Sequence, residues 1–293
     1  MKRGALIGGI AAAAFAVCVA PAAATFPGQD GSIVYIDRGH VMTMNPDGSS
    51  QTQLTNGAGN SDPAFSESGN GIVYAHRTGK NQAIVVMDAD GTHKHQLTKK
   101  HFDQTPAFSP NGRKIVFARG LHTKQYDFSG IFVMRSDGSH LKLLTHDKPV
   151  FSDEEAQPSY SADGKTIVFQ NLFSEDGGSS AMDANGDNVR GLGDNFVQPS
   201  FSPNGQQILY TELFGGQIGV MDADGGHPHA ITHKDRVDYL LPSYSPDGTK
   251  IVFAADTAGT VDIYVMNPDG TGTTKLTTDG HSGEPDWGPL PVG

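Results

Sequence analysis

A short string, Pro-x-aromatic-Ser, recurs along the chain and is usually followed by Pro-Asn-Gly or Pro-Asp-Gly. Full copies begin at Pro63, Pro106, Pro158, Pro199 and Pro242, and a partial copy, Pro285-Asp286-Trp287, lies near the end. Successive prolines are 43, 52, 41, 43 and 43 residues apart. A period of this length is typical of β-propeller blades. The spacing therefore predicts a repeat protein built from one structural unit.

Each copy continues with short runs of β-branched and aromatic residues, which predict strands. One run follows the glycine turn, as in Ile251-Val252-Phe253. Another ends in Met-x-x-(Asp/Asn)-Gly, as in 266–270, and a last short run ends in Leu-Thr or Ile-Thr, as at Leu276-Thr277. With the Pro-x-aromatic run, each unit has four strands, which is the composition of one propeller blade.

The two ends of the repeat region complement each other. The first unit, 31–55, has three strands and lacks the Pro-x-aromatic strand, whereas 284–289 has that strand with nothing after it. Joining them in one composite blade would close the ring and leave no long sheet edge exposed. The sequence thus predicts an all-β, six-bladed propeller with repeats at about 31–55 plus 284–289, 61–98, 103–145, 156–193, 196–232 and 239–277.

These motifs resemble the repeats of TolB-like β-propellers, which are similar to WD repeats. The resemblance covers about residues 31–289 and rests on Pro-x-aromatic-Ser-Pro-Asp-Gly, Met-Asn-x-Asp-Gly and Leu-Thr. It implies the propeller fold without the additional α/β domain that precedes the propeller in TolB. It does not fix a function, because propellers of this kind serve as envelope scaffolds, peptidase accessory domains and carbohydrate-active enzymes.

The first 24 residues have the pattern of a secretory signal peptide. Lys2 and Arg3 precede an apolar stretch that runs to Ala20, and Ala22-Ala23-Ala24 offers a cleavage site. A retained membrane anchor is the less favoured alternative, because the stretch is short and no polar stop follows it. We therefore expect an exported protein, periplasmic or secreted, with residues 25–293 as a single propeller domain. The only cysteine, Cys18, lies in the leader, so no disulfide is expected.

Charge narrows the range of partners. The net charge is −11, and it becomes −13 for residues 25–293 because Lys2 and Arg3 lie in the leader. Such a charge disfavours nucleic acid and anionic lipid surfaces and suits a cationic group. We expect no stable insertion in a membrane, a monomeric protein, and a protein or peptide partner in the cell envelope.

Both hairpin turns of a blade should lie on one face of the ring, so the variable connections between blades lie on the other, open face. Acidic and aromatic residues close to the repeat prolines should ring the channel mouth there. These candidates are Asp62, Asp103, Glu154, Glu155, Asp238, Tyr239, His281 and Glu284. The long segment 119–130 adds Tyr126 and Phe128 as an aromatic binding rim.

The sequence contains twelve histidines, which raises the question of a metal site. His93, His95, His227 and His229 follow hairpin turns of different blades and should face solvent. A divalent cation at the mouth is possible through His101, Asp103, His146, His281 and Glu284, but their spacing is not diagnostic, so no cofactor is predicted and the metal remains unknown. The Asp-x-(Asp/Asn)-Gly segments are read as turns, because they lack the frame of a calcium loop.

The sequence is compatible with two functions. No nucleophile elbow, phosphate-binding glycine loop or His-Glu-x-x-His motif is present, which favours a non-enzymatic module that binds a protein or peptide at the open channel face. The alternative is a metal-assisted carbohydrate lyase or hydrolase with its site at the mouth.

The fourth unit departs from the repeat. Ser179-Ser180-Ala181-Met182 replaces an apolar strand, and Leu192-Gly193 replaces Leu-Thr. We expect its outer strands to pair weakly and to offer an edge that a partner strand could join.

Overall fold

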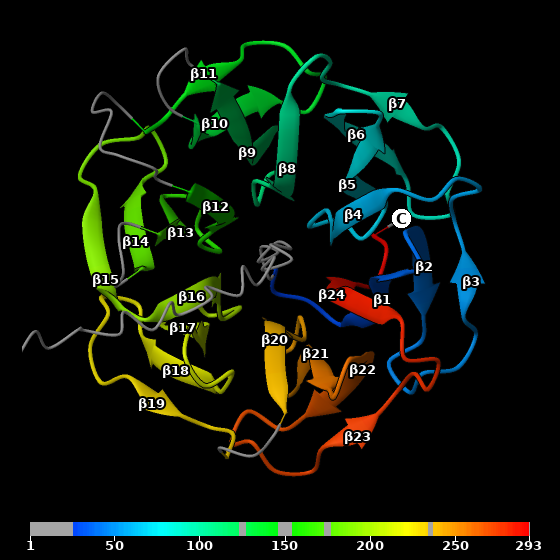
Figure 1. Cartoon of the computed structure of the whole chain (residues 1–293), viewed down its shortest axis with the longest axis vertical. Helices are drawn as coiled ribbons and strands as arrows, with labels where there is room; N and C mark the ends of the chain where they lie inside the picture. The colour runs from blue at the N-terminus through cyan, green and yellow to red at the C-terminus, as the bar shows by residue number, and fades with distance from the viewer. Residues whose placement is uncertain (1–25, 123–126, 146–153, 173–176, 234–236, 293) are drawn as a thin grey trace, which may run out of the picture.

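A computed structural model describes residues 26–122, 127–145, 154–172, 177–233 and 237–292. The expected signal peptide, residues 1–24, lies outside the described residues. The described chain is all β and forms a propeller: sheets are arranged around a central axis, with the first strand of each repeat innermost and a short strand at the periphery (Figure 1).

Four separate four-stranded sheets occupy much of the ring. The composite sheet contains β24 (Ser282–Pro289), β1 (Asp30–Asp37), β2 (His40–Met44) and β3 (Thr52–Gln53) in that order. The other three contain β12 (Glu154–Tyr160), β13 (Thr166–Leu172), β14 (Gly178–Asp183) and β15 (Arg190–Asp194); β16 (Phe196–Phe201), β17 (Gln207–Glu212), β18 (Ile218–Asp222) and β19 (His229–Ala230); and β20 (Asp238–Tyr244), β21 (Ile251–Thr257), β22 (Thr260–Met266) and β23 (Thr274–Lys275).

The remaining strands form one sheet of eight. It contains β4 (Asn60–Phe65), β5 (Gly71–Thr78), β6 (Asn81–Asp88), β7 (His95–Gln96), β8 (Phe102–Phe108), β9 (Lys114–His122), β10 (Asp127–Arg135) and β11 (Lys142–Leu143). A single parallel bridge, Gln82 to Phe102, joins β6 to β8. The backbone N–H of Gln82 donates to the His101 carbonyl at 2.8 Å. The hydrogen bonding therefore does not give the six separate blades that the repeat predicts.

The hairpin motif folds because its serine bridges both sides of the turn. The Ser109 hydroxyl donates to Asn111 Oδ1 at 2.9 Å and accepts the Lys114 amide at 3.0 Å. Ser161 and Ser245 form the same pair of bonds in their own hairpins. The turn glycine, such as Gly112 with φ of 65°, occupies the left-handed region that other residues avoid.

The Leu-Thr motif also has a local explanation. In five repeats the threonine hydroxyl accepts the backbone N–H of the third strand, as Thr277 does from Ile263 at 2.9 Å. The leucine amide donates to the same strand, from Leu276 to the Ile263 carbonyl at 2.8 Å. The motif thus fixes a peripheral strand that is only two residues long, such as β23.

The fourth repeat pairs better than its sequence predicts. Its outer strand β15 has five residues and makes four pairs with β14, whereas the other described outer strands have two residues. Small side chains allow this close pairing, and the buried Ser179 hydroxyl donates to the Phe196 carbonyl of the next sheet at 2.6 Å. The expectation of weak pairing was wrong.

Closure of the ring depends on the pairing of β1 with β24, which the sequence predicted. Ile33 lies opposite Trp287 across these strands. Trp287 is buried in a cluster with Ile33, Tyr35 and Met44 of its own sheet and with Val252, Ala254 and Ile263 of the neighbouring sheet. The closing strand therefore contributes to the packing between two sheets as well as to one.

Replacing Trp287 with Ala should lower the free energy of unfolding by about 3–5 kcal/mol, because it removes a buried aromatic side chain and leaves a cavity. Chemical denaturation of residues 25–293 measures this change. Trp287→Phe is the control and should cost less, because most of the apolar contact remains. Equal stability of Trp287→Ala and wild type would contradict the role of this residue in closure.

Candidate functional site

The residue before each repeat proline adopts an unusual backbone conformation. Asp62, Thr105, Gln157, Gln198, Leu241 and Glu284 have φ between 52° and 58°. A proline normally keeps the preceding residue in extended conformations, and few non-glycine residues have positive φ. In each innermost strand the register with the next strand shifts at this point, which marks a β-bulge. We call these six residues the bulge ring.

The bulges connect neighbouring repeats. The backbone N–H of Thr105 donates to Asp62 Oδ2 at 3.1 Å, and the backbone N–H of Gln157 donates to Thr105 Oγ1 at 3.2 Å. The Leu241 amide likewise donates to Gln198 Oε1 at 2.8 Å. Across the closure, the Asp62 amide donates to Glu284 Oε2 at 2.7 Å. The side chain of one bulge thus accepts the backbone of the next.

Two carboxyls of the bulge ring lie next to each other. Asp62 is 2% exposed, and its Oδ1 atom has no hydrogen-bond partner. Desolvation by burial raises the pKa of Asp62 to about 7. Burial, together with the negative charge of Asp62, raises the pKa of Glu284 to about 8. The closure therefore contains a carboxyl pair whose ionisation is unfavourable.

Another carboxyl, the buried Asp286, lies two residues beyond Glu284 in β24. Its Oδ2 accepts the Phe65 amide at 2.8 Å, and its Oδ1 accepts the Ser243 hydroxyl at 3.2 Å. These bonds tie the closing strand to β4 on one side and β20 on the other. Burial raises the pKa of Asp286 to about 7, because the hydrogen bonds only partly offset desolvation.

A pocket of about 370 Å³ opens beside Glu284, between the composite sheet and the β20–β23 sheet. Its apolar walls come from Ile36, Leu240, Leu241, Ala254 and Val261. Its charged or titratable lining residues are Arg38, His281 and Glu284. Because it includes the β1–β2 and β21–β22 turns, it lies on the face that the sequence predicts to be open. We call it the mouth pocket.

The predicted mouth residues do not form one site. Asp62 and Glu284 meet in the bulge ring, and His281 is exposed and lines the mouth pocket next to Glu284. His101 is exposed before β8, and Asp238 is exposed where β20 begins. Tyr239 lies edge-on to Phe253 with ring centroids 5.6 Å apart, and the Glu155 carbonyl accepts the Ser129 hydroxyl at 2.7 Å.

Asp103 is a structural residue and not a free acid at the mouth. It is fully buried and accepts two hydrogen bonds from Arg119, from Nε to Oδ1 at 2.6 Å and from Nη2 to Oδ2 at 2.9 Å. The Arg119 guanidinium also lies over the rings of Phe117 and Phe132. This carboxylate is already neutralised by the protein.

Some candidates cannot be placed. His146 and Tyr126 lie outside the described residues, and only the backbone of Glu154 and Phe128 is described, at the start of β12 and in β10. Among the described residues, no three His, Cys, Asp or Glu side chains lie close enough together to hold a metal ion. A divalent cation at the mouth, for which the sequence offers ligands without predicting it, stays a hypothesis.

Sequence reasoning missed four members of the bulge ring. It selected mostly acidic residues near the prolines, with Tyr239 and His281, whereas in the structure the bulge lies directly before each proline, whatever the residue type there. Thr105, Gln157, Gln198 and Leu241 could have been found by aligning the repeats on that position.

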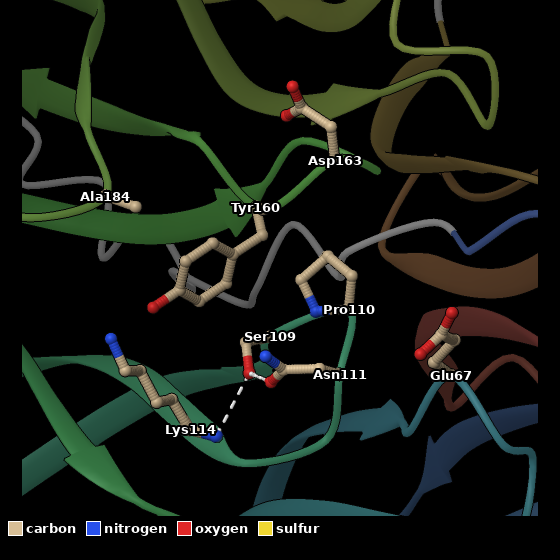
Figure 2. A pocket seen from close by; sticks show the side chains of 9 residues that line it. Glu67, Ser109, Pro110, Asn111, Lys114, Tyr160, Asp163 and Ala184 are labelled. Atoms are coloured by element: carbon tan, nitrogen blue, oxygen red, sulfur yellow. Dashed lines mark hydrogen bonds between the residues drawn. The ribbon is translucent and has the colours of Figure 1, made fainter.

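A second pocket of about 300 Å³ lies on the face of the hairpin turns (Figure 2). Ser109, Pro110 and Asn111 border it together with Tyr160 and Lys114. Tyr160 is buried, its hydroxyl has no described partner, and burial raises its pKa. Glu67 and Asp163 line the same pocket, which none of the sequence predictions included.

Comparison with known proteins places the chain among propellers. Residues 198–290 match the family described as TolB beta propeller domain. No curated protein matches significantly. Among solved structures, TolB of Acinetobacter baumannii is 21% identical with a TM-score of 0.76, and the match covers 90% of this chain and 68% of that one.

Two further structures share the fold. A protein assigned as TolB from Agrobacterium tumefaciens is 18% identical with a TM-score of 0.67, covering 89% of this chain and 99% of that one. Oligogalacturonate lyase of Vibrio parahaemolyticus is 12% identical with a TM-score of 0.53, covering 85% and 73%. In the part of the chain that the structure describes, no helix is long and apolar enough to span a membrane.

The raised pKa values of Asp62, Glu284 and Asp286 predict that the free energy of unfolding falls as the pH rises. Their pKa values of about 7 to 8 in the folded chain exceed those of ordinary carboxyls, about 4, in the unfolded chain. Between these values the folded state holds more protons, so the free energy of unfolding decreases by up to about 1.4 kcal/mol per pH unit for each group. We expect the melting temperature, followed by circular dichroism, to decrease from pH 5 to pH 9.

Asp286→Asn is the matched variant for this measurement. An asparagine can still accept the Phe65 amide and can donate to Ser243, but it does not titrate. The pH dependence should become shallower in this variant. Turn aspartates such as Asp163 have a lowered pKa, chiefly because the Ser161 hydroxyl donates to the carboxylate. Their contribution to the free energy of unfolding is lost only in acid, so they do not affect the slope between pH 5 and pH 9. A slope unchanged by Asp286→Asn would contradict the role of this carboxyl.

Replacing Asp103 with Ala should lower the free energy of unfolding by about 3–5 kcal/mol, because it leaves the buried Arg119 guanidinium without its partner. Chemical denaturation measures the loss. Asp238→Ala removes an exposed acid at the start of another inner strand and should change stability by less than about 0.5 kcal/mol. Equal effects of the two variants would refute the structural role of Asp103.

Proposed function

Because the chain is a TolB-like β-propeller, we propose that it is a non-enzymatic module that binds a protein or peptide partner through its open channel face. The observation that carries this proposal is the mouth pocket. It combines apolar walls with a few polar groups, which is the usual composition of a pocket that takes an anchoring side chain. It also lies on the face where the connections between repeats vary in length.

The proposal includes the finer features of the fold. The eight-stranded sheet corresponds to two repeats joined by one parallel bridge, so we count it as two blades of a six-bladed ring. The leader-like residues 1–24 support export, with the propeller acting as a monomer in the periplasm or outside the cell. Recovery of the protein only from the cytoplasmic fraction of its source would contradict export.

The carbohydrate-active alternative has less support. The fold shared with oligogalacturonate lyase comes with 12% identity, so it concerns the fold alone. The metal-assisted chemistry would need a cluster of ligands, and the described residues contain none. Turnover of a saccharide by the purified protein, lost on replacing His281 or Glu284, would favour this alternative over binding.

Site-specific photo-crosslinking tests the binding role. A photoreactive phenylalanine analogue replaces His281, which is exposed at the mouth pocket, or Leu141, which is 46% exposed near the outer strand β11. Each variant of residues 25–293 is incubated with envelope and secreted fractions of the source. We expect a defined protein to crosslink at position 281 and not at 141, because the partner contacts only the open face.

A mutation provides the second arm. Leu240→Glu places a charge in the apolar wall of the mouth pocket and should abolish the crosslink at position 281, whereas Leu141→Glu makes the same change elsewhere and should not. Melting temperatures check that both variants fold. Equal crosslinking at positions 281 and 141, or a crosslink that survives Leu240→Glu in a folded variant, would overturn the assignment of the open face.

A further inference from the structure

At one end of the mouth pocket, Glu284 has a carboxyl oxygen that can accept a hydrogen bond from a ligand. Glu284 is half-buried, and its Oε2 accepts the Asp62 amide at 2.7 Å. The other carboxylate oxygen of Glu284 accepts no hydrogen bond from a described residue. Since Glu284 lines the pocket, this oxygen is the acceptor available to a ligand that enters it.

No described basic side chain neutralises this end. Asp62, whose backbone N–H donates to Glu284, is buried and has no partner at Oδ1. Neither carboxyl forms a described salt bridge. Arg38, at the rim of the pocket, is engaged with Asp37 at 3.2 Å and Asp279 at 3.7 Å. The contrast with Asp103, which Arg119 neutralises, indicates that the Glu284 end, when ionised, is complementary to a cation from outside the chain.

The walls indicate what carries that cation. Leu240 and Val261 are partly exposed and line the pocket together with the more buried Ile36, so the approach to Glu284 is apolar. A lysine side chain has an apolar stem of four methylenes and a compact ammonium at its end. An arginine guanidinium is best matched by two carboxylate oxygens, and here one of them already accepts the Asp62 amide. A small cation without a stem would leave the apolar walls in water.

We propose that the mouth pocket binds a lysine side chain of the partner, with its methylenes against Leu240 and Val261 and its ammonium on Glu284. This inference rests on the proposed function, because it names the group of the partner that enters the open face. It adds the residue type that the face selects and the carboxylate that selects it.

Short peptides test the inference without a known partner. Acetyl-Gly-Gly-Lys-Gly-Gly-amide is titrated at pH 9 into isotope-labelled residues 25–293 and followed by NMR of the side-chain carbons. At this pH Glu284, with a pKa of about 8, is ionised, whereas the lysine of the peptide is still protonated. The matched peptide contains norleucine, which keeps the stem and lacks the charge, and a third contains arginine. We expect the lysine peptide to shift the signals of Leu240, Val261 and Glu284 with a Kd in the millimolar range, and the norleucine and arginine peptides to bind at least about tenfold more weakly.

Glu284→Gln is the matched protein variant, because the amide oxygen can still accept the Asp62 amide while the negative charge is removed. The variant should raise the Kd of the lysine peptide about tenfold and leave the Kd of the norleucine peptide unchanged. A melting curve confirms that the variant is folded. The inference is overturned if the lysine and norleucine peptides bind equally, if Glu284→Gln binds lysine as tightly as wild type, or if no peptide saturates up to about 10 mM.

The two proposals can fail separately. A protein that crosslinks at position 281 equally in wild type and Glu284→Gln would support the open face and refute the lysine pocket. A lysine peptide that binds as predicted, with no protein crosslinked at position 281, would support the pocket and refute the wider binding role.

Discussion

The pairing of β1 with β24 is the interaction on which the rest of the structure depends. A propeller sheet buries its apolar faces against the two neighbouring sheets, so an open ring would expose faces and edges at both ends. Here the two ends of the repeat region share one sheet, and Trp287 of the closing strand packs on both its own sheet and the β20–β23 sheet. Closure is therefore a packing event between sheets as much as a hydrogen-bonded one.

The bulge ring runs through the closure, where its carboxyl acceptors lower the stability of the folded chain. At four of the six bulges the backbone N–H donates to the side chain of the bulge residue in the neighbouring repeat; the donors are Asp62, Thr105, Gln157 and Leu241. At the closure the acceptors are carboxyls, and burial raises the pKa of Asp62, Glu284 and Asp286. A neutral acceptor would avoid this penalty, as Thr105 and Gln198 do in other repeats. Stability given up at one position is often a sign of function.

The mouth pocket lies at the same seam. Its walls come from β1, β20, β21, β22 and the start of β24, so both the last complete repeat and the closing strand build it. The carboxyl pair of Asp62 and Glu284 and the apolar walls of the mouth pocket thus occur together where the chain ends meet. This position gives the ring one face that differs from its other inter-sheet junctions, although the repeats themselves are similar.

The sequence by itself determined the propeller, its strands and its closure, because local turn chemistry and alternating apolar residues repeat with a fixed period. Ser109, Gly112 and Thr277 act within their own hairpins and can be read one repeat at a time. Only the tertiary structure decided which acidic side chains near the repeat prolines are paired with a basic residue and which line a pocket. Asp103 and Glu284 both precede a repeat proline closely, yet one is neutralised by Arg119 and the other borders a pocket. That difference depends on which side chains neighbouring strands bring together in space, and spacing along the chain does not encode it.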